Sequence, residues 1–164
     1  MNSIFEEVQR KVFKRCSFHI SEYEQESESQ EYEACKFELN GQFIISRKAK
    51  VTPKKRGQFV TFWKRNKSGV IEPYSEDDKA DYFVVNIISE GRHGQFVFPK
   101  SLLVQKGIIS SKKKEGKRAF RVYSPWDEVI SSQAKKTRQW QIDYFYEIKE
   151  DMDVKKIIEL YNAQ

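Results

Sequence analysis

Lysine and arginine gather in two blocks in the middle of the chain. Residues 47–67 hold nine Lys or Arg residues and no acidic residue, and residues 92–121 hold nine against the single acidic residue Glu115. Because a solvated surface ordinarily mixes the two signs, these blocks predict one basic face if the fold brings them together. Such a face suits phosphate, since Lys and Arg neutralise it and release its counterions. Nucleic acid is therefore the expected partner.

The first block places cations at both ends of one expected strand, residues 58–64. A strand of this length spans on the order of 23 Å, so the two groups would mark one long edge. Gln58 and Trp63 are side chains of the kind that hydrogen-bond to bases or stack on them, which favours binding over a plain solubilising surface. The residues that we expect to contact nucleic acid are Lys54, Lys55, Arg56, Gln58, Lys64, Arg65, Lys67, Arg92, His93, Lys100, Lys117, Arg118, Lys135, Lys136 and Arg138.

Residues 133–141 carry cations and amides together near the end of an expected helix, residues 126–138. On such a helix these side chains could contact DNA. Cations at a helix C-terminus also suit the helix dipole without any ligand. Both explanations stay open for this segment.

Carboxylates followed by a lysine could hold magnesium in a nuclease, and Asp81, Glu115 and Lys117 have that spacing. Glu115, however, lies in a lysine-rich loop, where such a site would need an apolar strand. The surrounding acidic loop, residues 72–81, is better explained as a solvated loop or as partners of nearby lysines. Metal-dependent cleavage is therefore the alternative hypothesis, and an interaction module that uses the acidic N-terminal segment is a further one.

Other catalytic chemistry has little support. His19 and His93 have no recognisable nucleophile partner, and His93 is expected in a turn, where it could contact phosphate. Cys16 and Cys35 form no CxxC motif and are expected to be free thiols. The chain also has no glycine-rich phosphate loop. We therefore expect a non-catalytic protein with no metal and no cofactor.

Length and hydropathy indicate one soluble domain, residues 1–164. No apolar run approaches the roughly 20 residues that cross a bilayer. The first residues carry Glu6 and Glu7 and lack the apolar centre of a signal peptide. We expect a cytoplasmic protein with no membrane partner.

Short apolar runs between turn residues predict an α+β fold, a twisted antiparallel β-barrel-like domain with N- and C-terminal helices. A capping box at Ser3 and Glu6 opens a helix over residues 3–16. Phe59, Thr61 and Trp63 alternate along residues 58–64, with Phe59 expected in the core. The expected strands are residues 34–39, 42–49, 58–64, 70–73, 82–88, 95–98, 118–123 and 140–148. A helix over residues 140–148 is the rival to the last strand, and further helices are expected at residues 99–106, 126–138 and after 153.

Four ordered stretches resemble the MepB family, bacterial proteins named for a gene beside a multidrug efflux pump. They are RKAKVTPKKRGQFVTFWKR, GQFVFPKSLLVQKGIIS, GKRAFRVYSPWDE and QAKKTRQWQIDYF, and the resemblance runs over roughly residues 31–145. It implies a fold similar to the DNA-binding effector domain of type IIE restriction endonucleases, a pseudobarrel. In that fold two loops grip the major groove of duplex DNA, and here they would come from residues 47–67 and 92–121. The resemblance brings no catalytic residues with it.

Overall fold

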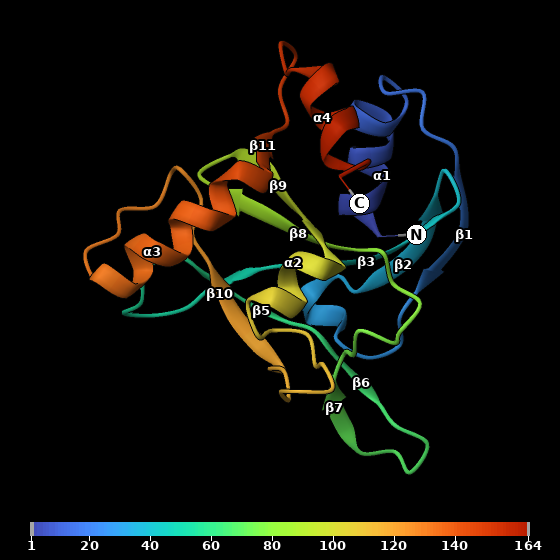
Figure 1. Cartoon of the computed structure of the whole chain (residues 1–164). Coiled ribbons are helices and arrows are strands. Elements are labelled where there is room, and N and C mark those ends of the chain that lie inside the picture. Colours follow the sequence, from blue (N-terminus) through green and yellow to red (C-terminus); the bar gives the residue numbers. More distant parts are fainter. Residues whose placement is uncertain (1, 164) are drawn as a thin grey trace.

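The computed structural model describes residues 2–163, which form a three-layer α+β structure (Figure 1). The helical elements are α1 (Ser3–Val8), the π-helical turn η1 (Gln9–Phe13), the 3₁₀ turn η2 (Gln30–Tyr32), α2 (Lys100–Gln105), α3 (Ser132–Gln141), the 3₁₀ turn η3 (Ile142–Tyr144) and α4 (Val154–Leu160). The strands are β1 (Ile20–Gln25), β2 (Cys35–Leu39), β3 (Gln42–Lys48), β4 (Lys50–Val51), β5 (Gln58–Thr61), β6 (Trp63–Arg65), β7 (Ile71–Pro73), β8 (Tyr82–Ser89), β9 (Arg92–Pro99), β10 (Ala119–Val122) and β11 (Phe145–Glu147).

A six-stranded mixed sheet in the order β1-β2-β3-β8-β9-β11 forms the middle layer. Its neighbours pair antiparallel except β3 and β8, which run parallel with Ile44 opposite Tyr82. The prediction of an antiparallel sheet is wrong at this pair, because the chain makes a long crossover through β4 to β7 before it returns. A second sheet, β10-β5-β4, and a two-stranded ribbon, β6-β7, complete the strands. Within residues 2–163 these sheets do not close into a barrel.

Strand β8 is the centre of the fold, as its apolar run predicts. Its side chains alternate between two hydrophobic cores, with Tyr82 and Val84 in one and Phe83, Val85 and Ile87 in the other. The five side chains are all nearly inaccessible to solvent. A strand buried on both faces can be apolar throughout, which explains why the run has no polar alternation.

Helices α1 and α4 cover one face of the six-stranded sheet, and the second sheet with α2 and α3 covers the other (Figure 1). The N-terminal helix is confirmed, but its cap is Asn2, whose side chain accepts a hydrogen bond from the Phe5 N–H at 2.7 Å. The capping box predicted at Ser3 and Glu6 lies one residue too late. The helix expected after residue 153 is confirmed as α4, and Asp153 caps it. No helix in the described part of the chain is long and apolar enough to span a membrane.

The expected strand over residues 58–64 is broken at Phe62. β5 pairs with β10 and β4, whereas β6 pairs with β7, so the two cationic groups flank different sheets. The buried face of this segment is also opposite to the one predicted. Val60 and Phe62 are fully buried, and Phe59 is only half-buried. Apolar residues stand at both odd and even positions here, so the alternation alone does not select a face.

The segment after β10 departs from the predicted helix start. Ser131 caps α3, its side chain accepting from the Ala134 N–H at 3.1 Å, so the helix begins at residue 132 and not at 126. Asp127 instead accepts from the Ser124 N–H at 2.8 Å and closes a turn. Residues 140–148 contain both predicted alternatives in succession, the end of α3 followed by η3 and then β11.

Two predicted nucleic-acid contacts, Gln58 and His93, lie inside the protein. His93 is in β9 and not in a turn, and its Nε2 is 3.0 Å from Asn86 Oδ1. Gln95 also donates to Asn86 Oδ1, at 2.8 Å, and the Gln58 amide donates to the Ile88 carbonyl at 3.1 Å. These side chains satisfy buried polar groups, so they are not available at the surface.

Burial makes His93 a source of pH-dependent stability. It lowers the pKa of His93 below the ordinary 6.5, outweighing Glu7, which raises it. The unfolded chain therefore binds a proton as pH falls through about 6.5 while the folded chain resists it. We expect the free energy of unfolding to be highest above about pH 6.5 and to fall as the pH drops below that value.

Urea denaturation of the wild type and of His93→Gln, from neutral to mildly acidic pH, measures the effect. In His93→Gln the free energy of unfolding should depend much less on pH, whereas His19→Gln, at an exposed position, should keep the pH dependence of the wild type. Equal slopes in the two variants would exclude His93 as the source.

Both cysteines are free, as predicted, and both are buried. Burial raises the pKa of the Cys35 thiol to about 11 and also raises that of Cys16. Thiols of this kind are protonated at neutral pH and react slowly.

Candidate nucleic-acid interface

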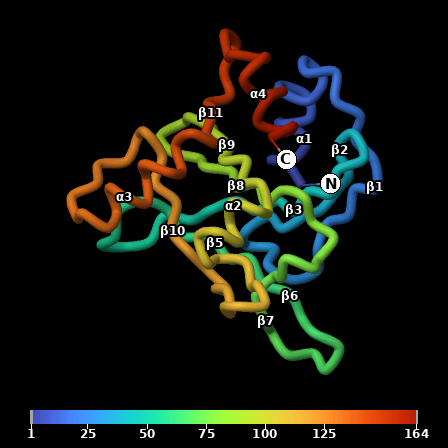
Figure 2. The backbone as a smooth tube through the Cα atoms, viewed as in Figure 1, coloured from blue at the N-terminus to red at the C-terminus, as the bar shows by residue number. Residues whose placement is uncertain are grey.

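A groove runs between α3 and β10, and we call it the α3–β10 groove. It consists of two adjoining cavities of about 350 and 470 Å³ that share Arg121, Tyr123, Ser131 and Ala134. The smaller cavity is also lined by Lys106, Ile108, Lys117, Ala119, Phe120, Gln133, Thr137, Trp140 and Gln141. The larger one is also lined by Lys55, Arg56 and Ile130. In the backbone trace the segment between β4 and β5 passes the start of α3 (Figure 2). Lys55 and Arg56 of this segment line the larger cavity.

Strand periodicity places one wall of the groove. Lys117, Ala119, Arg121 and Tyr123 alternate along β10 and its flanks, and all four line the smaller cavity. Residues two apart on a strand share a face, so a cationic and aromatic row follows from the sequence. Val122, between them, is fully buried on the opposite face.

Helical periodicity places the other wall. Gln133, Thr137, Trp140 and Gln141 stand at helical spacing on one side of α3. Gln141 is fully buried and joins the two walls: it accepts from the Tyr123 N–H at 2.8 Å and donates to the Arg121 carbonyl at 3.0 Å. These two bonds fix the separation of α3 and β10.

The groove is positively charged along its length. Five cations line its two cavities, namely Lys55, Arg56, Lys106, Lys117 and Arg121, and within residues 2–163 no carboxylate does. The nearest neutralising contact is Arg56 with Glu128 at 3.3 Å, and both side chains are more than half exposed. Such a pair exchanges readily with solvent or with a phosphate.

Arg121 holds the loop before β5 against the groove. Its Nε donates to the Arg56 carbonyl at 3.0 Å and its Nη2 to the Gly57 carbonyl at 3.1 Å. Gly57 has φ +70°, and a Cβ there would stand 2.6 Å from the Tyr123 ring. Only glycine allows this close approach, so Lys55 and Arg56 are held beside β10.

Three of the residues predicted from the sequence therefore come together here: Lys55 and Arg56 from the first basic block and Lys117 from the second. The Lys55 and Lys117 side chains form no hydrogen bond or ion pair with any residue of the described chain. Both are exposed and both remain available to an anion.

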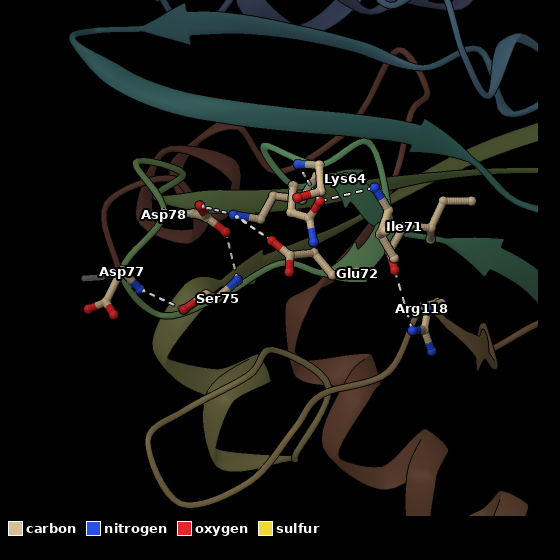
Figure 3. A network of polar contacts seen from close by, with 10 residues as sticks. Lys64, Ile71, Glu72, Ser75, Asp77, Asp78 and Arg118 are labelled. Atoms are coloured by element: carbon tan, nitrogen blue, oxygen red, sulfur yellow. Dashed lines mark hydrogen bonds and ion pairs between the residues drawn. The ribbon is translucent and has the colours of Figure 1, made fainter.

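The cations after the expected strand behave differently, because carboxylates already hold them. Lys64 Nζ lies 2.6 Å from Asp78 and 3.6 Å from Glu72 (Figure 3). Burial lowers the pKa of Lys64, but these two partners more than offset it and leave the pKa raised. Arg65 forms a forked pair with Glu28 at 2.7–3.0 Å and lowers the pKa of that carboxyl. These cations lie on the β6-β7 ribbon, which projects away from the groove (Figure 1).

The other predicted residues are scattered over the surface. Arg92 lies 4.6 Å from the Trp126 ring, Lys100 donates to the Asp78 carbonyl at 2.8 Å and Arg138 to the Asp127 carbonyl at 2.7 Å. Arg118 makes a weak contact with the Ile71 carbonyl at 3.4 Å (Figure 3). The remaining four predicted residues are exposed and lie outside the lining of the groove: Lys54, Lys67, Lys135 and Lys136.

The residues of the nuclease alternative line no common cavity among residues 2–163. Glu115 lines a mixed-charge cleft of about 630 Å³ beside Lys64 and Asp78, Lys117 lines the α3–β10 groove, and Asp81 accepts from the Phe43 N–H at 2.8 Å. The described chain also contains no group of three or more His, Cys, Asp or Glu residues placed to hold a metal ion.

Sequence reasoning missed Lys106, Arg121, Tyr123 and Trp140 as groove residues. The alternation of Lys117, Arg121 and Tyr123 could have revealed the strand wall. Lys106 follows α2 and lies 5.3 Å from the Trp140 ring, a contact between distant segments that no local pattern indicates.

Comparisons with known proteins agree on one family. A family model described as MepB-like matches residues 26–147. A solved structure described as the crystal structure of MepB matches with a TM-score of 0.78 and 34% sequence identity, over 92% of this chain and 100% of that chain. No curated protein matches the chain.

Proposed function

The chain belongs to the MepB-like family, and from the basic groove of this member we propose a non-catalytic nucleic-acid-binding protein that holds duplex DNA along the α3–β10 groove. The observation that carries the proposal is the lining of the groove, which joins five cations from three separate segments with no carboxylate of the described chain among them. Elsewhere carboxylates contact Lys64 and Arg65, whereas Lys55 and Lys117 stay free.

The proposed grip uses both basic blocks, one at each end of the groove. The loop that carries Lys55 and Arg56 contacts the phosphates at one end, and Lys106 and Lys117 contact those at the other. Arg121 lies between them, anchored to backbone carbonyls. This grip keeps the two-loop arrangement of the sequence prediction, with Lys106 and Arg121 in place of Lys64 and Arg65 of the β6-β7 ribbon.

We also propose the finer fold assignment, a DNA-binding pseudobarrel of the type found in the effector domains of type IIE restriction endonucleases. The proposal is supported by the arrangement of a mixed sheet and a second, smaller sheet around one core that contains Phe62, Phe83 and Val122. Superposition on a solved effector domain tests it, and a TM-score below 0.5 would reject it.

The test of the function is a salt titration of duplex binding. Neutralising three to five phosphates predicts that affinity falls about 40- to 500-fold between about 50 and 200 mM salt. Fluorescence anisotropy of a labelled duplex measures it. No binding at low salt, or an affinity independent of salt, would contradict the proposal.

A further inference from the structure

Resting on the proposed function, we infer that the smaller cavity of the α3–β10 groove is a pocket for one unpaired nucleobase. The ligand class is then a duplex that carries a bulged or flipped base, and the protein prefers it to a fully paired duplex. Aromatic side chains, free polar groups and cations converge on this one cavity.

Aromatic side chains form the lining where a base would stack. Phe120, Tyr123 and Trp140 are each half-buried and line the same cavity of about 350 Å³. Fully paired DNA presents only base edges, whereas an unpaired base presents a π-face that aromatic rings bind. A row of cations alone would explain phosphate binding, but it would not require three aromatic residues.

The aromatic rings are held in place by core contacts. Trp140 packs on Phe98 with ring centroids 5.6 Å apart, and Phe120 is stacked on Phe62 at 6.0 Å. Tyr123 packs against Gly57, and its own backbone N–H donates to the Gln141 side chain. Rings fixed in this way are pre-organised, so a base binds without ordering them first.

Free polar groups stand where the edge of the base would lie. Gln133 and Thr137 are one helical turn apart on the wall of the cavity, and neither side chain forms a hydrogen bond within residues 2–163. An amide and a hydroxyl can donate to and accept from a base edge. Gln141, in contrast, is fully committed to the backbone of β10.

Cations flank the aromatic residues at the same cavity. Lys106 lies 5.3 Å from the Trp140 ring, and Lys117 is free. A nucleotide that places its base in the cavity brings its own phosphates to these two ammonium groups. A base that is already unpaired enters most readily, because the duplex gives up no stacking or pairing to release it.

The test compares two duplexes of equal length at low salt. One is fully paired, and the other carries a single bulged 2-aminopurine, whose fluorescence falls when it stacks on an aromatic ring. We expect the bulged duplex to bind about tenfold more tightly, with quenched fluorescence. Equal affinity and unchanged fluorescence would overturn the inference and leave the proposed function intact. Failure of both duplexes to bind would reject the proposed function itself.

A matched pair of variants locates the effect. Gln133→Ala combined with Thr137→Ala should lower the ratio of bulged to paired affinity by about fivefold, because the edge contacts are lost. Gln139→Ala, at an exposed position of α3 outside the groove lining, should keep the ratio. Trp140→Leu should abolish the quenching and Trp140→Phe should retain it, with circular dichroism as the check on folding. A ratio that does not respond to the double variant would contradict the assignment of this cavity.

Discussion

Reversing two charges in the groove, Lys55→Glu with Lys117→Glu, is expected to weaken duplex binding at low salt by on the order of 100-fold or more. Two phosphate contacts are lost and two repulsive charges enter a groove that no carboxylate of residues 2–163 lines. The two side chains are exposed and form no hydrogen bond or ion pair with the described chain, so the substitutions should not change folding. Anisotropy titrations should show the slope of log affinity against log salt reduced by about two.

Matched controls separate the groove from net charge. Lys149→Glu with Lys155→Glu makes the same change of charge at exposed positions outside the groove lining and should cost only a few-fold. Lys67→Glu, on the turn of the β6-β7 ribbon, tests the site that the sequence alone favoured. A loss of duplex affinity in Lys67→Glu as large as that in the groove variant would show that the ribbon is part of the interface and would contradict the groove assignment.

Glu26→Leu is expected to lower the free energy of unfolding by about 3–5 kcal/mol. Its carboxylate pairs with Arg47 Nη1, and Arg47 is only 2% exposed. The guanidinium also donates to the Ser46 carbonyl at 3.0 Å and lies 5.4 Å from the Phe62 ring, so it cannot move to solvent without disturbing the core. The variant leaves a buried charge without its counter-ion, and urea denaturation measures the cost.

Two further variants test this explanation. Glu31→Gln breaks the exposed pair with Lys50 at 2.8 Å and should cost less than about 1 kcal/mol. Glu26→Leu combined with Arg47→Met removes both charges and should recover most of the stability. A loss below about 1 kcal/mol for Glu26→Leu alone would show that Arg47 is not dependent on its partner.

Local chemistry made much of the fold predictable. The Asn40-Gly41 pair, a typical hairpin turn, joins β2 to β3, and the apolar run of β8 is central. Asp153 caps α4, and Pro99 precedes α2. Each of these features depends on a few adjacent residues whose preferred conformations agree with the final structure.

The remaining features depend on partners distant in sequence. The parallel pairing of β3 with β8 and the burial of His93 against Asn86 follow from long-range assembly that no window of sequence contains. Because residues 58–64 carry apolar side chains on both faces, the sequence does not determine which face is buried. It also does not predict the break at Phe62, between β5 and β6.

The same limit applies to the candidate interface. Composition identified two basic blocks, but not which cations the fold would neutralise. Arg65 meets Glu28 and Arg47 meets Glu26 across long separations, whereas Lys55 and Lys117 meet no carboxylate in the described chain. Charge density in the sequence leads to the proposal of a nucleic-acid partner, and only the ion pairs of the fold distinguish the cations that stay free.

Chemical-shift mapping of the ¹⁵N-labelled protein with a short duplex locates the nucleic acid on the protein and so decides whether the α3–β10 groove is the interface. We expect the perturbed amides to cluster in residues 54–58, 117–123 and 131–141, the walls of the α3–β10 groove. Perturbations confined to the β6-β7 ribbon or to α4, or none at low salt, would contradict it.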